Sequence, residues 1–408
     1  MRILWVSSIA WKTISGYPYP VNGAGAVSGS LFQQSMIEGL EQLGHTVDIV
    51  SEYPYVSGSN THQDLNWKHR DDAEDIAVKT IDIPYYSLIH KASSLKKAVK
   101  KKLDENKYDI AVAYLIHQPF MSAISHAKRL DPQIKTVLIC PDLPDMMDMS
   151  LSQKKLKSFL KKIDKKRIER LYKKIDGFVL FAKAMQEKIT NQNARFTVIE
   201  GVASVEDLDI KPVNKETFIM YAGTLHKNIG IENIIDSIEF IDDTDTKLKI
   251  YGTGELEEYI KERASESSRI VYGGFIDRNE LFEEQKKAIA LVNARNPEDE
   301  YTKYSFPSKT FEYLYSGTPF VTTKLIGVPD EYSKYLFEID NNTPKTIARA
   351  INQIAKTNKD DILSKCANAR EFVINNKNGI NQTKKMENFL NFLIKENIDE
   401  PFNKEREN

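Results

Sequence analysis

The sequence predicts an α/β protein with two doubly wound, Rossmann-like domains, each built on a parallel sheet. Apolar runs of strand length alternate with amphipathic stretches of helix length along nearly the whole chain, the pattern of parallel βαβ units. The alternation stops once, in a polar stretch at 204–216, and then restarts. With 408 residues the chain is long enough for two domains. We therefore expect a first domain at 1–203, a linker at 204–216 and a second domain at 217–380.

The elements of the first half follow from apolar runs and spacing. Apolar side chains recur at helical spacing from Leu31 to Leu43, and Gly44 follows as a left-handed cap. A loop rich in glycine, proline and serine precedes this helix. The strands expected in this half cover 2–8, 45–51, 109–116, 135–141, 176–182 and 196–202.

The second half repeats the organisation. A helix at 308–316 is expected to end at Gly317, with Pro319 beyond it, and a later helix is expected near 345–356. The tail at 381–408 contains an amphipathic helix, which we expect to pack back on the first domain. The strands expected in this half cover 217–224, 247–254, 269–275, 289–295 and 319–324.

The composition is that of a soluble globular protein, with 41% hydrophobic and 28% charged residues. A net charge of −1 excludes a polycation that binds nucleic acid with its whole surface. The two cysteines, Cys140 and Cys366, fit neither a disulfide framework nor a zinc site and favour a reducing compartment. The first residues lack a cleavable signal pattern, and no run of about 18 apolar residues occurs, so we expect a cytoplasmic protein.

The most informative stretch is "RNPEDEYTKYSFPSKTFEYLYSGTPFVTTK", residues 295–324. Ser308 is an N-cap residue at a helix start, where free backbone N–H groups attract anions. Lys309 adds a positive charge that the helix dipole disfavours there, and Arg295 ends the preceding strand. Glu312 can accept hydrogen bonds from a vicinal diol. A nucleoside diphosphate fits this group, and the alternative is an exposed Lys309–Glu312 pair without a ligand.

Four segments of the second half resemble the retaining glycosyltransferases of family 4, which have the two-domain GT-B fold. They are "YAGTLHKNIGIENIIDSI" (221–238), "LKIYGTGELEEYI" (248–260), "VYGGFIDRNEL" (271–281) and "YSFPSKTFEYLYSGTPFVTT" (304–323). In the first half "GAGAVSGS", "LGHTVDIVS", "YDIAVAYLIHQPF" and "DGFVLFAKAM" fit the same family. The block from 295 to 331 most resembles bacterial enzymes that build capsular polysaccharides and exopolysaccharides.

The resemblance implies a transfer of sugar from a nucleotide-diphosphate donor, a UDP-sugar by preference, to a hydroxyl of a lipid-linked saccharide. It implies retention of the anomeric configuration, no cofactor, and two domains that face each other across the donor cleft. Arg295 and Lys309 would stabilise the leaving diphosphate, and Glu312 would bind the ribose. His117, which follows the strand at 109–116, would position the donor sugar; a buried histidine satisfied by its neighbours is the alternative.

One departure from the family concerns the donor sugar. Many members carry two glutamates with seven residues between them. Glu312 matches the second glutamate, and Tyr304 stands at the place of the first. The acidic residues at 298–300 are the candidates to replace the missing carboxylate.

A second departure concerns the charge that holds the diphosphate. Thr224 and Ile229 stand where many members carry arginine and lysine, so His226 and Lys227 are secondary candidates beside the two cations described above. An Asp-x-Asp pattern lies within 242–246 but precedes a strand, and we interpret it as a surface loop. We therefore expect metal-independent chemistry.

Further candidates lie in loops. Gly25 in "NGAGAVSGS" would let the backbone approach the donor, although an ordinary turn explains the loop equally well. Gly254 in "YGTGE" would line the base pocket, with a tight strand–helix turn as the alternative, and Phe275 would help to enclose the base. Asp142 and Asp145 follow a strand and would orient acceptor hydroxyls, with loop capping as the alternative.

Residues 154–174, "KKLKSFLKKIDKKRIERLYKK", contain eleven lysines or arginines and two acidic residues. Their apolar residues recur at near-helical spacing, and a basic amphipathic helix suits an anionic membrane surface. "KKAVKKK" (96–102) would add to it. We expect peripheral contact with the inner face of the plasma membrane; a solvated helix docked on its own sheet is the alternative. Few aromatic residues accompany the basic ones, so nucleic acid is not an expected partner.

Three other functions stay open. A nucleotide-sugar epimerase can share this architecture and would release an epimerised sugar nucleotide without an acceptor. An inactive paralogue that stabilises an active partner is compatible with Tyr304 and Thr224. A nicotinamide-dependent oxidoreductase is disfavoured, because the glycine loop lies more than ten residues after the first strand.

Overall fold

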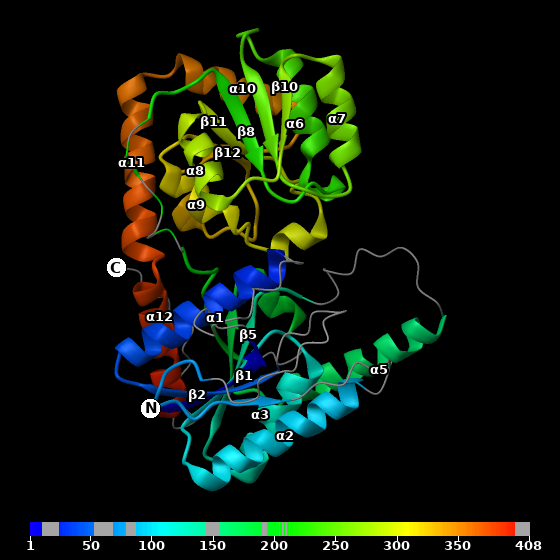
Figure 1. Ribbon diagram of the computed structural model, residues 1–408, viewed down its shortest axis with the longest axis vertical. Coiled ribbons are helices and arrows are strands. Elements are labelled where there is room, and N and C mark those ends of the chain that lie inside the picture. The colour runs from blue at the N-terminus through cyan, green and yellow to red at the C-terminus, as the bar shows by residue number, and fades with distance from the viewer. Residues whose placement is uncertain are drawn as a thin grey trace. The chain divides into compact units, whose positions relative to one another are not determined.

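The computed structural model describes residues 1–9, 24–52, 68–78, 87–143, 155–189, 194–203, 205, 208, 210–211 and 213–395, without the side chains of 24–28 and 155–162. The chain forms two compact units, and each is a parallel sheet with helices on both faces (Figure 1). The predicted fold class is confirmed. The first unit contains Met1–Val202 and Gly379–Asn408, and the second contains Ala203–Asn378. The sequence-based boundaries were 203 and 380.

The first unit has a seven-stranded sheet in the order β3-β2-β1-β4-β5-β6-β7, with every described pair of neighbours parallel. Its strands are β1 (Arg2–Ser8), β2 (Thr46–Glu52), β3 (Ile76–Val78), β4 (Ile110–Tyr114), β5 (Lys135–Cys140), β6 (Gly177–Leu180) and β7 (Arg195–Val198). The strand order reverses between β1 and β4. Parallel sheets bind ligands at the carboxyl ends of the strands beside such a switch point.

The helices of the first unit are α1 (Ala24–Gln42), α2 (Ser87–Glu105), α3 (Gln118–Leu130), α5 (Lys155–Tyr172), the 3-10 helix η1 (Lys183–Lys188) and α12 (Gly379–Lys395). Helix α1 ends at Gly44, which has a φ of 86° as the predicted left-handed cap requires. Helices α1 and α12 pack side by side on one face of the sheet, and α3 packs against both α2 and α5 on the other (Figure 1).

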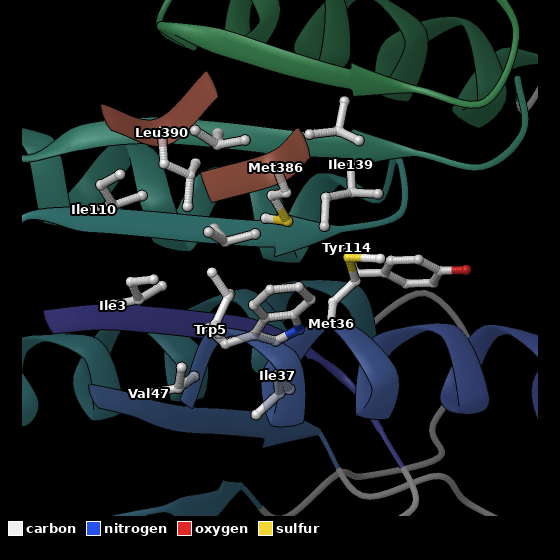
Figure 2. Packing of buried hydrophobic residues seen from close by; sticks show 14 of the residues in the cluster. Ile3, Trp5, Met36, Ile37, Val47, Ile110, Tyr114, Ile139, Met386 and Leu390 are labelled. Carbon is white, nitrogen blue, oxygen red and sulfur yellow. The ribbon is translucent and has the colours of Figure 1, made fainter. Parts of the chain in front are cut away.

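The core under α1 and α12 joins segments far apart in the sequence. Figure 2 shows Trp5 of β1 in one cluster with Met36 of α1 and with Met386 and Leu390 of α12. The helix α12 approaches so closely that a Cβ atom added at Gly177 would lie 2.6 Å from the Leu393 side chain. The C-terminal helix is therefore an integral part of the first unit.

The second unit has a six-stranded sheet in the order β10-β9-β8-β11-β12-β13, again parallel throughout its described pairs. Its order reverses between β8 and β11, which form the second switch point. Its strands are β8 (Phe218–Ala222), β9 (Lys247–Tyr251), β10 (Ile270–Gly274), β11 (Ala290–Asn293), β12 (Phe320–Thr323) and β13 (Phe337–Ile339). Its α-helices are α6 (Ile231–Ser237), α7 (Glu257–Glu266), α8 (Arg278–Lys287), α9 (Lys309–Ser316), α10 (Pro344–Lys356) and α11 (Lys359–Asn376). Its 3-10 helices are η2 (Lys227–Ile229), η3 (Ile238–Phe240), η4 (Glu300–Tyr304) and η5 (Asp330–Tyr332).

Two cores lie on opposite faces of this sheet, because successive strand residues point to opposite sides. Ile219 of β8 packs in the cluster with α6, α7 and α10, and its neighbour Met220 packs in the cluster with α8, α9 and α11. This arrangement places the start of α9 at the carboxyl edge of the sheet. Within the described part of the chain, no helix combines the length and the apolar character that crossing a membrane requires.

Candidate active site

The candidate residues of the second unit gather at the switch point between β8 and β11. β8 ends at Ala222, with Thr224 two residues later, and β11 ends at Asn293, with Arg295 two residues later. The hydroxyl of Thr323, the last residue of β12, donates to the carbonyl oxygen of Arg295 at 2.7 Å. The backbone of Arg295 is thereby fixed at the carboxyl edge of the sheet.

The Arg295 side chain is half-buried and has no counter-ion among the residues that the structure describes. Its Nη1 donates to Ser305 Oγ over a long 3.4 Å, and its guanidinium carbon lies 6.0 Å from the ring centre of Tyr301. Its Nε is buried without a hydrogen-bond partner, and it forms no salt bridge with any residue that the structure describes. Burial raises the pKa of Tyr221, and the positive charge of Arg295 opposes that rise. An unpaired buried cation is costly and suits a site for an anion.

Lys309 is the first residue of α9 and is also half-buried. Its ammonium group has no hydrogen bond or salt bridge to the described residues. The preceding Ser308 is exposed and has a helical backbone (φ −55°, ψ −27°), so its hydroxyl does not cap the helix. The predicted helix start is confirmed to within one residue, whereas the predicted side-chain cap is wrong. The start of α9 therefore keeps backbone donors available beside Lys309.

Glu312 is oriented by α8. Its Oε1 accepts a hydrogen bond from Gln285 Nε2 at 2.7 Å, and its Oε2 lies 3.6 Å from Arg278 Nε. The carboxylate is 15% exposed. Each carboxylate oxygen can accept more than one hydrogen bond, so these contacts leave capacity for hydroxyl donors. Sequence reasoning missed Gln285 and Arg278, because they meet Glu312 only through helix packing.

Tyr313, fully buried on α9, ties this helix to the end of β8. Its hydroxyl lies 2.9 Å from the backbone nitrogen of Ala222 and 3.0 Å from the carbonyl oxygen of the same residue. One side chain therefore pairs both backbone groups at the strand end. The helix start that carries Lys309 is held in register with the switch point.

The loop after β8 is fastened to its neighbours. The carbonyl oxygen of Thr224 accepts a hydrogen bond from the Tyr221 hydroxyl at 2.8 Å. Thr224 itself is exposed. The exposed Lys227 donates its backbone N–H to Glu255 Oε1 at 3.0 Å. The Tyr301 hydroxyl donates to the Asn228 carbonyl at 2.7 Å, which joins this loop to the surroundings of Arg295. Tyr301 lies inside the stretch 295–324, but no pattern in the sequence predicted that it joins these two loops.

The loop after β9 is packed against the loop after β8. A Cβ atom added at Gly254 would lie 2.4 Å from the Leu225 carbonyl oxygen, and Leu225 donates its N–H to Thr253 at 3.0 Å. The tight turn considered as the alternative thus accounts for this glycine. Phe275 follows β10 and is 80% exposed. The carbonyl oxygen of the preceding Gly274 accepts from the Gly252 N–H at 2.8 Å, so Phe275 lies near the loop that carries Gly254.

Tyr304, at the end of η4, is buried. Of the acidic residues considered as substitutes for a glutamate at this place, Asp299 accepts from the Asn296 amide at 3.1 Å. Glu298 and Glu300 are exposed. In the Asp-x-Asp loop, Asp243 accepts from the backbone of Asp245 at 3.0 Å.

The remaining candidates belong to the first unit. His117 follows β4 at the start of α3, and its ring lies 5.0 Å from that of Phe120. Burial, and then the charge of Lys91, lower the pKa of His117 to about 4, so the imidazole is neutral at pH 7. Asp142 follows β5 and adds to the effect of burial in raising the pKa of Tyr114.

Two candidates of the first unit have a different outcome. Gly25 lies in α1 rather than in the expected loop. Asp145 lies outside the described residues. The candidates therefore form two groups, one at the carboxyl edge of each sheet, and the cleft between them stays a prediction.

Comparison with known proteins agrees with this architecture. Residues 216–357, which include Arg295, Lys309 and Glu312, match the family model described as "Glycosyl transferases group 1". No curated protein matches the sequence. The family match concerns the second unit only.

Solved structures match over nearly the whole chain. Sucrose-phosphate synthase from Thermosynechococcus elongatus superposes with a TM-score of 0.69 at 14% identity, over 96% of this chain and 99% of that chain. The lipopolysaccharide outer core galactosyltransferase WaaB gives 0.64 at 12% identity, over 96% and 99%. HepE from Anabaena, in complex with UDP, gives 0.62 at 14% identity, over 96% and 100%. At these identities the likeness shows the fold, which is GT-B. The family model and the fold together support a glycosyltransferase.

Proposed function

We propose that this protein is a retaining glycosyltransferase of family 4 that moves a sugar from a nucleotide-diphosphate donor to a saccharide hydroxyl. The observation that carries the proposal is that two half-buried cations at the β8–β11 switch point, Arg295 and Lys309, form no salt bridge with the residues that the structure describes. A guanidinium, an ammonium and the free N–H groups of a helix start are the groups that bind a diphosphate.

In the proposed reaction, negative charge grows on the β-phosphate as the glycosidic bond of the donor breaks. Arg295 and Lys309 stabilise that charge, and they supply the compensation that a divalent metal supplies in other enzymes. Glu312, held by Gln285, accepts hydrogen bonds from the ribose hydroxyls. His117 positions the donor sugar as a neutral hydrogen-bonding group, because its lowered pKa of about 4 rules out a general acid at pH 7.

We further propose a UDP-sugar donor and a lipid-linked saccharide acceptor met at the inner face of the plasma membrane, in the synthesis of capsular polysaccharide or exopolysaccharide. The UDP in the HepE structure supports this choice of base. The resemblance of residues 295–331 to enzymes of that synthesis supports the acceptor. Asp142 belongs to the first unit, whereas Arg295, Lys309 and Glu312 belong to the second, and Asp142 would orient the acceptor hydroxyl.

The experiment is a panel of UDP-, GDP- and ADP-sugars, scored by thermal shift and by release of nucleotide. We expect Arg295→Ala and Lys309→Ala each to reduce kcat/KM at least tenfold, because one lost charge-stabilising contact costs on the order of 3 kcal/mol. Lys359→Ala is the matched control, because Lys359 is the exposed first residue of another helix, α11. Wild-type rates in both active-site variants would remove these residues from the mechanism.

The buried Tyr304 favours a second candidate function. A phenol at the place of a family glutamate is compatible with an inactive paralogue that binds a partner glycosyltransferase. Binding of a sugar nucleotide without any release of nucleotide, even with Tyr304→Glu, would favour that function over transfer.

A further inference from the structure

Three helices of the first unit carry a concentration of positive charge on one side of the sheet. Helix α3 packs against α2 and against α5 (Figure 1). We call nine of the exposed or half-buried cations on these helices the basic face. It consists of Lys96, Lys97 and Lys100 of α2, Arg129 of α3, and Lys166, Arg167, Arg170, Lys173 and Lys174 in and just after α5.

Helical spacing aligns these cations within each helix. Lys96 and Lys100 are four residues apart, and Lys166 and Arg170 are also four apart, so each pair lies along one side of its helix. His126 and Arg129 are three residues apart, and their side chains hydrogen-bond at 2.8 Å. Helices α2 and α5 therefore each contribute a row of cations, and α3 contributes Arg129.

Cations from different helices lie close enough to repel one another. Burial lowers the pKa of Lys96, and the charges of Arg129 and Lys174 lower it further. The pKa of His126 is lowered by burial and then by Arg129, Lys96 and Lys100. Like charges brought together in this way destabilise the fold, and a bound anion would relieve the repulsion.

Acidic groups pair with part of the positive charge on these helices. Lys100 pairs with Asp104 at 2.7 Å, and Lys101 and Lys128, which are outside the basic face, pair with Glu105 and Asp176. Lys96, Lys97, Arg170, Lys173 and Lys174 form no salt bridge with the residues that the structure describes. Most of the positive charge is therefore available to a partner.

Exposed apolar side chains lie beside these cations. Ile89 is 61% exposed and precedes Lys96 by seven residues, two helical turns, so it lies on the same side of α2. Leu130 is 44% exposed and follows Arg129 at the end of α3. Cations flanked by exposed apolar side chains fit a bilayer interface, because the apolar side chains can be buried there. A soluble polyanion offers no apolar region in which to bury them.

We propose that the basic face docks the first unit on an anionic lipid bilayer, with its cations against the headgroup phosphates and with Ile89 and Leu130 in the interface. This surface adds α3 to the segments 96–102 and 154–174 that the sequence predicted for membrane contact. It does not depend on the proposed transfer reaction, because Arg295 and Lys309 belong to the second unit. Docking and donor binding can therefore fail separately.

The test is co-sedimentation of the full chain with vesicles. We expect binding to phosphatidylcholine vesicles that contain phosphatidylglycerol, no binding to pure phosphatidylcholine, and loss of binding in high salt. The variant Lys96→Glu/Arg129→Glu/Arg170→Glu should bind on the order of a hundredfold more weakly, since each cation near the surface contributes roughly fivefold. Lys359→Glu/Lys384→Glu/Lys385→Glu, three exposed lysines outside the basic face, should bind as the wild type does. Undiminished binding by the first triple variant, or no binding to the anionic vesicles, would overturn the proposal.

A second variant separates a bilayer from a soluble polyanion. We expect Ile89→Asn, which removes the apolar group without adding a charge, to weaken binding to anionic vesicles several-fold and to leave binding to inorganic polyphosphate unchanged. Equal vesicle binding by wild type and Ile89→Asn, together with polyphosphate binding as tight as vesicle binding, would assign the face to a soluble polyanion and overturn the proposal. Circular dichroism, run on each variant, checks that the first unit, which carries the substitutions, is folded.

Discussion

At the scale of single residues, the first unit contains a buried histidine held between two carboxylates. His69 is 1% exposed in its side chain, with Nδ1 2.7 Å from Asp75 Oδ2 and Nε2 3.0 Å from Glu41 Oε1. Arg70 also donates to Glu41, at 2.5 Å, and binds Asp72 on its other side. Burial opposes a charge on His69, but the hydrogen bonds to the two carboxylates outweigh it and raise the pKa to about 9.

The raised pKa of His69 predicts a loss of stability in alkaline solution. The folded-state pKa of about 9 exceeds the ordinary value of 6.5, so the stabilisation is complete below pH 6.5 and is lost as the pH rises through 9. We expect the free energy of unfolding of the first unit to fall by on the order of 3 kcal/mol over this range. Urea unfolding followed by circular dichroism measures it. His69→Gln should lack this fall, and identical pH profiles for the two proteins would contradict the assignment.

The sequence predicted the position of single residues where the signal was local. It placed Lys309 and Glu312 in the first turn of a helix, because a helix start is recognisable from "SFPSK" and the helix end from the glycine that follows it, whereas their role in binding a donor stays a prediction. The hydrogen bond from Gln285 to Glu312 was not predictable, because it depends on how α8 packs against α9. The predicted cap at Ser308 failed because its backbone is already helical.

At the scale of elements, the turn after β9 depends on a backbone contact that only glycine permits. Gly252 has a φ of 133°, and a Cβ atom there would lie 1.8 Å from the Gly223 carbonyl oxygen. Gly274, whose carbonyl accepts from the Gly252 N–H at 2.8 Å, has a φ of 68° but no atom within 4 Å of such a Cβ. A residue with a side chain would be strained by the backbone angle at both positions, but only at Gly252 would its Cβ atom also clash with the neighbouring backbone.

This difference predicts unequal effects of alanine at the two glycines. Gly274→Ala should cost about 1 kcal/mol, the strain of a left-handed backbone. Gly252→Ala should cost more than about 3 kcal/mol, because the two backbone segments must also separate. Calorimetric unfolding of both variants tests the prediction. Equal losses of stability would mean that the two backbone segments can separate at no cost, which would contradict the prediction.

The elements found from the sequence were those with a strong apolar pattern. The eleven strands expected from apolar runs all occur, displaced by a few residues at their ends. Helix α11 was not predicted, because only Cys366, Ala369, Phe372 and Val373 of its 18 residues are buried and its apolar pattern is weak. β3 and β13 escaped notice because each has three residues at a sheet edge.

At the scale of the whole molecule, the first unit is completed by the end of the chain. Met386, Phe389, Leu390 and Leu393 of α12 are at most 1% exposed. Burying four such side chains contributes on the order of 8 kcal/mol, comparable with the entire stability of a domain. The Gln382 amide adds a hydrogen bond to the Gly201 carbonyl at 2.7 Å.

We therefore expect a chain that stops after Asn378 to lose the folded first unit and to keep the second. A chain that stops after Lys395 is the matched control, because it retains α12, and it should unfold as the full chain does. Urea unfolding by circular dichroism, combined with limited proteolysis to identify the folded part, measures the outcome. Native stability of the first unit without α12 would contradict the assigned packing.

Alternation of strands and helices was enough to predict two domains, because each βαβ unit has its own local pattern. The boundary near 202 was found where that pattern stops. What the sequence did not provide is the register between segments far apart, such as α12 against α1, since the pairing of two amphipathic faces is decided by shape. The glycines at 39 and 177, which leave room for α12, show that fit only in three dimensions.

The return of the chain to its first unit has a consequence for protein synthesis. The ribosome finishes residues 203–378 before it makes α12, so the second unit can fold while the first is still incomplete. Until α12 emerges, the growing polypeptide presents an uncovered apolar sheet face to the crowded cell. The first unit is therefore translated first but completes its folding last, after α12 has been synthesised.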